Sequence, residues 1–219
     1  MGWTKVVRLL LLMLVATGAW ASEWELARDR SGIQVWTREE PGFPIHAFKA
    51  TTVVKSSLSG LVSLILDTDR ASQWAYRTTR IEVLRRDDEA ATFLIRAETD
   101  FPWPFSDRDV VLAGQISQDE KTRVVTIHSY STPPGQYATA SGFVRMPEMK
   151  GDWIFRPLGG GLVEVTMVGR ADPGGNIPGG LVSMIIHETP YQTLSGLRKV
   201  IVDERYQRAR ILKIRELQE

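Results

Sequence analysis

The amino-acid sequence predicts an α+β domain in which a curved antiparallel sheet wraps around one long C-terminal helix. Two observations support this class. Through the middle of the chain, short segments rich in β-branched and aromatic residues alternate with polar or glycine-rich turns. After residue 172 the pattern changes to a single long helical repeat. Because parallel strands would need helical crossovers between them, the strands are expected to pair in antiparallel hairpins.

The first 21 residues have the three parts of a secretory signal peptide. Lys5 and Arg8 precede an unbroken apolar run over 9–16, and Ala19-Trp20-Ala21 offers small residues to a signal peptidase. The apolar stretch is too short for a membrane anchor, which needs about 20 residues to cross ~30 Å of hydrocarbon. We expect cleavage after Ala21, a mature domain over 22–219, and a periplasmic location, with secretion as the alternative.

Composition excludes several classes of function. Removing Lys5 and Arg8 from the 27 basic residues leaves 25 against 26 acidic ones, so no basic field for nucleic acid exists. The absence of cysteine excludes disulfides, thiolate catalysis and cysteine-based zinc sites. With 43% hydrophobic and 24% charged residues and no repeat or linker, the chain is expected to form one globular domain. Its oligomeric state is not indicated.

The elements are expected in the following order. Two strands, 33–38 and 46–55, flank the turn signal Pro41-Gly42. Ser57 is a plausible N-cap for a short helix with apolar residues at helical spacing, and a second helical turn is expected over 71–74. The remaining strands are expected at 80–86, 90–99, 109–116, 123–130, 152–157 and 162–171.

A long helical pattern runs from about Gly180 to Leu217, with Pro190 expected to kink it. At 1.5 Å per residue this helix would be about 55 Å long, so its charged end is expected to project or to pack elsewhere. Burying its apolar stripe against the concave sheet would leave an apolar space for a ligand. The stripe consists of Val182, Ile186, Leu194, Leu197 and Ile201.

Three segments resemble the StAR-related lipid-transfer (START) family. They are LDTDRASQWAYR, which contains Trp74; AETDFPWPFSDRDVV, which contains Glu98, Arg108 and Asp109; and ADPGGNIPGGLVSMIIHETPYQTLSGLR, with a PGG-x-IP loop before the helix. SGFVR, at 141–145, is a weaker fourth match. Together they cover most of the mature chain in order and spacing.

The resemblance implies a helix-grip (START-like) fold with a lipid tunnel closed by the C-terminal helix. It also implies that the loop 100–107 forms part of the tunnel mouth. In phosphatidylcholine-binding relatives an arginine binds the lipid phosphate, and its place falls here at Ala71. A glutamine and an aromatic residue of the same headgroup cage fall at Gly151 and Ala97. The headgroup cage is therefore not carried over, and the sequence does not indicate which lipid is bound.

A set of residues is expected to contact the ligand: Ile65, Trp74, Glu98, Phe101, Trp103, Arg108, Leu181 and Ile185. Trp103, at the tip of an aromatic and proline-rich loop, is expected to touch a membrane surface transiently, although these rings are also typical of core that plugs a sheet edge. Arg108 has a structural alternative, in which it pairs with Glu98 and fixes the loop.

The expected function is lipid binding for transfer or sensing, without catalysis, metal or cofactor. The three histidines lie far apart, and His187-Glu188 lacks the second histidine of a zinc-protease motif. The alternative is a helix-grip cyclase or hydrolase that uses a cavity carboxylate, for which Glu98 and Asp100 are the candidates. No nucleophile and base are recognisable by their spacing.

Overall fold

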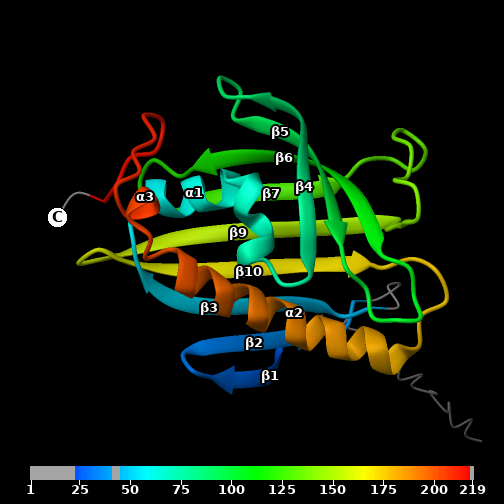
Figure 1. The fold of residues 1–219 in the computed structure, drawn as a ribbon. Coiled ribbons are helices and arrows are strands. Elements are labelled where there is room, and N and C mark those ends of the chain that lie inside the picture. The colour runs from blue at the N-terminus through cyan, green and yellow to red at the C-terminus, as the bar shows by residue number, and fades with distance from the viewer. Residues whose placement is uncertain (1–22, 41–44, 218–219) are drawn as a thin grey trace, which may run out of the picture.

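The computed structural model describes residues 23–40 and 45–217, and its strands form one sheet (Figure 1). The strand order is β1-β2-β3-β10-β9-β7-β6-β5-β4, antiparallel throughout, with the short β8 parallel to β6. The predicted signal peptide lies outside the described residues. The strands are β1 Glu25–Arg30, β2 Ile33–Arg38, β3 Ala47–Lys55, β4 Thr78–Asp87, β5 Thr92–Thr99, β6 Arg108–Gln118, β7 Val125–Ser131, β8 Val144–Arg145, β9 Glu148–Gly159 and β10 Leu162–Asp172.

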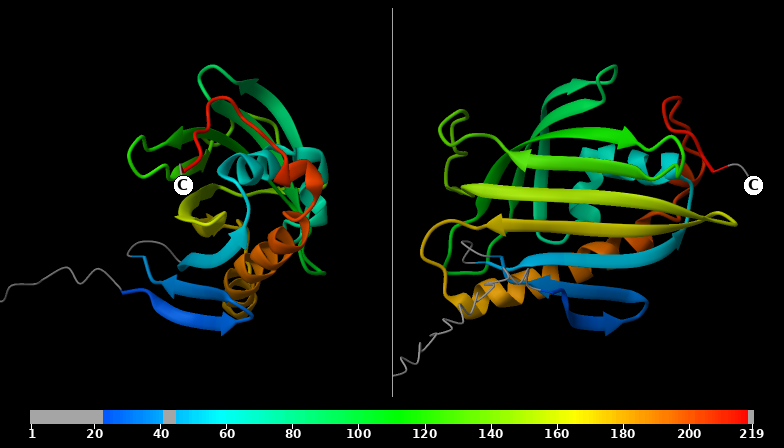
Figure 2. Two further views of the ribbon diagram at one scale, coloured as in Figure 1. Left: turned by 90° about the vertical axis from the view of Figure 1, so that its left-hand side faces the viewer. Right: turned by 180° about the vertical axis from the view of Figure 1, so that it is seen from behind.

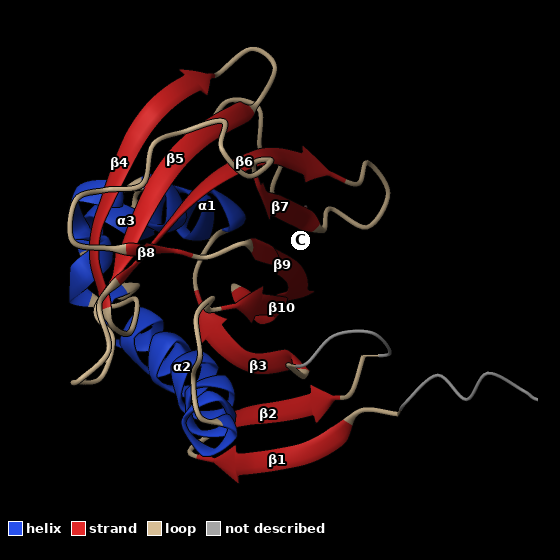
Figure 3. Cartoon of the chain, turned by 90° about the vertical axis from the view of Figure 1, so that its right-hand side faces the viewer, coloured by secondary structure: helices blue, strands red, loops and turns tan. Residues whose placement is uncertain are grey.

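The sheet curves into an arc, and the helices lie on its concave side (Figures 2 and 3). These are α1 Leu58–Leu66, the 3-10 helix η1 Thr68–Gln73, α2 Gly179–Val200 and α3 Glu204–Gln207. The predicted α+β helix-grip architecture, with a helix against a curved antiparallel sheet, is confirmed. Among the described residues, no helix is long and apolar enough to cross a membrane.

The short helix α1 begins where its sequence predicts. The Ser57 hydroxyl accepts a hydrogen bond from the Gly60 amide at 3.0 Å, which satisfies one of the amides that a helix start leaves unpaired. Leu58, Leu61 and Leu64 are fully buried against the sheet. The chain then tightens into η1, which ends beside the buried Trp74.

The two halves of α2 have different surroundings. Leu194 and Leu197, in the second half, are fully buried in the core, which also contains Ile33 and Phe155 of the sheet. The helix continues through Pro190. Its second half can approach η1 closely because residue 196 is a glycine: a Cβ there would clash with the backbone of Trp74. The core therefore fixes the C-terminal half of α2, and the N-terminal half lies over a hollow part of the sheet.

The predicted helix end near Leu217 is wrong, because α2 ends at Val200. After α3 the chain folds back against α1, where the Glu216 carboxylate accepts hydrogen bonds from the amides of Leu58 at 2.8 Å and Ser59 at 2.9 Å. Tyr206 is 2% exposed and donates to Asp67. Burial of this ring and the capping of α1 outweigh the helical propensity of the charged sequence. The charged end therefore packs on the domain and does not project.

Strands β1 and β8 were absent from the sequence prediction. The sequence ELARDR of β1 lacks apolar alternation because this edge strand is mostly exposed. Strand β8 has only two residues, too few for any periodicity. The other strands lie within a few residues of their predicted ranges, apart from β9, which is longer at its N-terminal end.

Candidate ligand-binding cavity

An apolar cavity of about 320 Å3 lies between the concave face of the sheet, η1 and the N-terminal half of α2. This volume falls within the range of small-molecule sites. Strands β4, β5, β6, β7, β9 and β10 contribute residues of their concave face to the wall, and β3 contributes Phe48. Helix α2 contributes the inner face of its segment between Val182 and Thr193. Representative wall residues are Phe93, Ile95 and Trp153 from the sheet and Val182, Ile185 and Ile186 from α2.

Two indole rings lie where the cavity meets the core. Trp74 and Trp153 meet edge to face with their ring centroids 5.8 Å apart, and both line the cavity. Ile65, at the end of α1, lies on the same wall. The position of Trp74 follows from the turn after η1, which points its ring inward between α2 and the sheet.

Two loops form the end of the cavity beside the start of α2. The loop 100–107 supplies Phe101, which is 8% exposed and lines the cavity, and its ring meets that of Phe105 edge to face at 6.3 Å. The Asp107 carboxylate accepts a hydrogen bond from the Phe101 amide at 3.0 Å and closes this loop on itself. The second loop, 173–178, leads into α2.

Arg108 joins these two loops. It is 2% exposed, and its guanidinium donates to the backbone carbonyls of Ser106 in one loop and of Pro173 and Gly174 in the other. The same group lies 4.0 Å from the centre of the Phe101 ring. Burial lowers the pKa of Arg108, and the charge of Asp107 opposes this shift. Because its N–H groups donate to carbonyls of both loops, Arg108 acts as a latch between the loops, and it also lines the cavity.

Asp109, the next residue, faces the opposite side of β6. Its carboxylate is fully buried and accepts from Arg145 at 2.9 and 2.7 Å and from the Ala140 amide at 3.0 Å. Burial acts to raise the pKa of Asp109, but these hydrogen bonds and the charges of Arg145 and Arg96 outweigh burial and lower it. This ion pair holds the segment between β7 and β8 against the sheet.

The predicted pairing of Arg108 with Glu98 is wrong. In the β5–β6 register, Arg108 lies opposite Thr99, and Glu98 lies opposite Asp109. Successive side chains of a strand point to opposite faces, so Glu98 faces away from the cavity. Its carboxylate is 3.9 Å from Arg80. The sequence shows the alternation within β5 but does not show which of its faces is concave.

The other predicted contact residues divide between the cavity wall and the surface. Ile65, Trp74, Phe101, Arg108 and Ile185 line the cavity. Trp103 is 92% exposed at the loop tip, and neither Leu181 nor Glu98 lines the cavity wall. Sequence reasoning missed the β4 and β5 wall residues, and the alternation of TFLIRAET would have found Phe93, Ile95 and Ala97 once the register was known.

The enzyme alternative required a carboxylate in the cavity. Glu98 faces outward, and Asp100 forms an ion pair with Arg77 at 2.6 Å and lies off the cavity wall. No aspartate or glutamate of the described chain lines the cavity. The titratable side chains on its wall are His46, Tyr76, Arg86 and Arg108.

Strand β1 attaches to the N-terminal half of α2 by a small charged cluster. Arg28 pairs with Glu188 at 2.9 Å and lies 4.6 Å from the centre of the Tyr191 ring. Burial lowers the pKa of His187, and the nearby charges of Arg28 and His46 lower it further. Polar contacts with the β1–β2 hairpin therefore hold this half of the helix.

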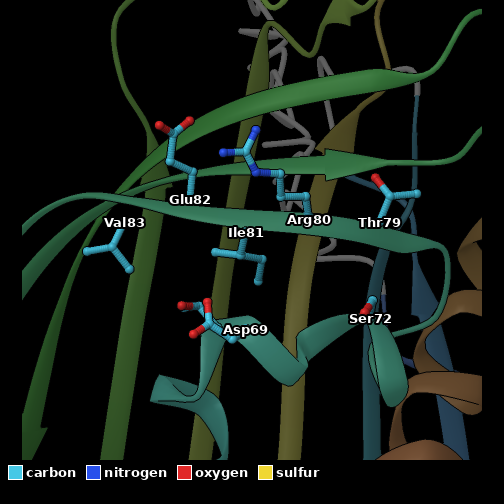
Figure 4. Close-up of a pocket in the computed structure, with 8 residues that line it drawn as sticks. Asp69, Ser72, Thr79, Arg80, Ile81, Glu82 and Val83 are labelled. Carbon is cyan, nitrogen blue, oxygen red and sulfur yellow. The ribbon is translucent and has the colours of Figure 1, made fainter.

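A second pocket, of about 390 Å3, opens to solvent between η1 and β4 (Figure 4). Thr68, Asp69 and Ser72 of η1 form one side of this polar pocket, and the consecutive residues 79–83 of β4 form the other. Ile81 and Val83 point from β4 toward η1, whereas Arg80 and Glu82 leave the other side of the strand. Three residues, Thr68, Ile81 and Val83, line both this pocket and the apolar cavity.

Comparison with known proteins identifies the family. The family model described as the START domain matches residues 7–201. The chain belongs to the START-domain family. Members of this family bind lipids or other hydrophobic ligands.

Relatives of this START domain occur in bacteria and in mammals. It is 30% identical to a STAR-related lipid transfer protein of Xanthomonas axonopodis, whose crystal structure superposes with a TM-score of 0.74 over 81% of this chain and 98% of that one. It is 29% identical to an uncharacterized protein of Pseudomonas aeruginosa over 84% of this chain and 89% of that one. Mouse phosphatidylcholine transfer protein is 26% identical over 76% of this chain and 77% of the relative.

Proposed function

We propose that this START domain binds one lipid, or a similarly hydrophobic molecule, in the apolar cavity and carries or senses it. The observation that supports the proposal is the cavity itself. Most of its wall is built from apolar side chains, among them Phe93, Trp153 and Ile185. A folded core of this kind normally closes on itself, because unfilled apolar space forfeits packing. A ligand that fills the space would restore those contacts.

The loop 100–107 is the proposed contact with a membrane surface. Trp103 is almost fully exposed at its tip, and Met184 on the outer side of α2 is 52% exposed. An indole combines a large apolar ring with one polar N–H, which suits the interface between headgroups and acyl chains. Such a contact would place the cavity mouth beside the lipid, with the Arg108 latch between the mouth loops as the gate.

The proposed location is the periplasm, following cleavage of the signal peptide after Ala21. N-terminal sequencing of the protein from a periplasmic extract is then expected to begin at Ser22. Full-length chain retained in the cytoplasm would contradict this location without affecting the proposed binding function.

Native mass spectrometry of the mature protein tests the binding function. The protein is purified without detergent, and a second sample is incubated with liposomes of defined composition before re-isolation. We expect a one-to-one adduct whose mass matches a lipid recovered by solvent extraction. Protein that remains empty in both samples would contradict the proposal.

A further inference from the structure

We propose that the polar pocket between η1 and β4 holds the hydroxyl-rich polar end of a ligand whose apolar part lies in the cavity. This inference rests on the proposed function and adds to it a chemical class of ligand, an alkyl chain with a sugar-like or glycerol-like head.

The apolar cavity opens sideways at the edge of the sheet. Ile81 and Val83 lie opposite Ala97 and Ile95, which line the cavity, so they share the concave face with these residues. Val83 is nevertheless 46% exposed, and both side chains also line the polar pocket. Solvent thus reaches the concave face between β4 and η1, and a ligand chain in the cavity has a path to the pocket.

The pocket offers both hydrogen-bond acceptors and donors to such a ligand. Asp69 is exposed, and its carboxylate has no hydrogen bond or ion pair within the described residues. Ser72 adds a hydroxyl. Strand β4 is the edge of the sheet, and five consecutive residues of it line the pocket, so its outward backbone amides and carbonyls are also available.

This combination favours neighbouring hydroxyl groups over an anion. A hydroxyl donates to the Asp69 carboxylate and accepts from a backbone amide, so a polyol satisfies both kinds of group at once. A phosphate or carboxylate would meet Asp69 with like charge. Arg80 is the cation among the residues that line the pocket, but its side chain leaves the other side of β4 and lies 3.9 Å from Glu98.

The mouth between the two loops beside the start of α2 offers little to a polar head. Arg108 is the cation there, and the backbone carbonyls of Ser106, Pro173 and Gly174 already accept its hydrogen bonds. Binding a head at Arg108 would first have to break these contacts. The open polar pocket requires no such rearrangement.

Isothermal titration with two amphiphiles of equal chain length, below their micelle concentrations, tests the inference. Decyl glucoside carries a hydroxyl-rich head, and decanoate carries an anionic one. The Asp69→Ala substitution is expected to lower the affinity for decyl glucoside at least about fivefold, because a hydrogen bond to a charged group is lost. The affinity for decanoate is expected to stay the same or to rise.

The matched control is Glu120→Ala, which removes the same charge from an exposed turn outside both pockets. It is expected to leave both affinities unchanged. If Asp69→Ala affects both amphiphiles equally, or affects neither, the inference is overturned while the cavity function stands. If neither amphiphile binds the unaltered protein and no lipid adduct is found, the proposed function fails and the inference fails with it.

Discussion

At the scale of single residues, adjacent side chains on β6 serve different parts of the molecule. Arg108 faces the cavity and latches the two mouth loops, and Asp109 faces the convex side and holds the segment before β8. The dipeptide matches the family pattern, and its strand register explains why the two side chains have separate partners. Both are buried charged groups whose hydrogen bonds offset the cost of burial.

Removing the latch is expected to loosen the mouth and destabilise the fold. Arg108→Met keeps an apolar side chain beside Phe101 but leaves three carbonyl contacts unmade, so the free energy of unfolding should fall by about 2–4 kcal/mol in urea titrations. Arg108→Lys should recover only part of this loss, since a single ammonium group cannot reproduce the planar fork. If Arg108→Met is as stable as the unaltered protein, the hydrogen bonds of Arg108 do not contribute to the free energy of unfolding.

The Asp109 ion pair predicts a loss of stability in acid. Because folding lowers the pKa of Asp109, its contribution is complete above the unfolded value of about 3.9 and disappears as the pH falls through the lower folded value. Asp109→Asn should cost about 3–5 kcal/mol at pH 7, and its difference from the unaltered protein should shrink below about pH 4. A difference that stays constant from pH 7 to pH 3 would argue against an ionised Asp109.

At the scale of elements, the sequence predicts most segments but not their pairing or their ends. The alternation of β5 and the Ser57 cap of α1 are local signals, so they are visible without the structure. The end of α2 depends on the burial of Tyr206 and on Glu216 reaching α1, which are contacts between distant segments. Five predicted site residues lie on the cavity wall. Glu98 faces the other side of its strand, because the register between β5 and β6 is also a contact between segments that the sequence does not show.

Two glycines of α2 provide a matched test of its packing. Alanine at 196 should destabilise the domain by about 1–3 kcal/mol because its Cβ would collide with the backbone of Trp74, despite the better helix propensity of alanine. Alanine at 180 has open space and should be neutral or stabilising by up to about 1 kcal/mol. Thermal unfolding of both variants measures the difference, and equal effects would refute the close contact between α2 and η1.

The exposed loop tip predicts an effect on transfer without an effect on folding. Trp103→Ala should change the free energy of unfolding by no more than about 0.5 kcal/mol, because the ring contacts little of the core. Transfer of a fluorescent lipid between liposomes should slow by about tenfold if the ring enters the interface. A large fall in melting temperature with normal transfer would instead mean that the ring belongs to the core.

At the scale of the whole molecule, the cavity arises from an unequal distribution of packing along α2. The C-terminal half is fixed by Leu194, Leu197 and the glycine contact with Trp74, so the helix cannot close down on the far end of the curved sheet. The N-terminal half is held there by the polar Arg28–Glu188 pair and by the loop that Arg108 latches. An apolar space that no side chain fills thus remains between the helix and the sheet.

Binding of lipid in the cavity is tested most directly by a substitution that fills the cavity, followed by a measurement of bound lipid. Ala171→Phe places a ring on the cavity wall, and Ala113→Phe places the same ring on the convex face of β6. After incubation with liposomes, native mass spectrometry should show one lipid per chain in the unaltered protein and in Ala113→Phe. The folded Ala171→Phe protein should carry little or none. Equal lipid occupancy in both variants would contradict binding in the cavity.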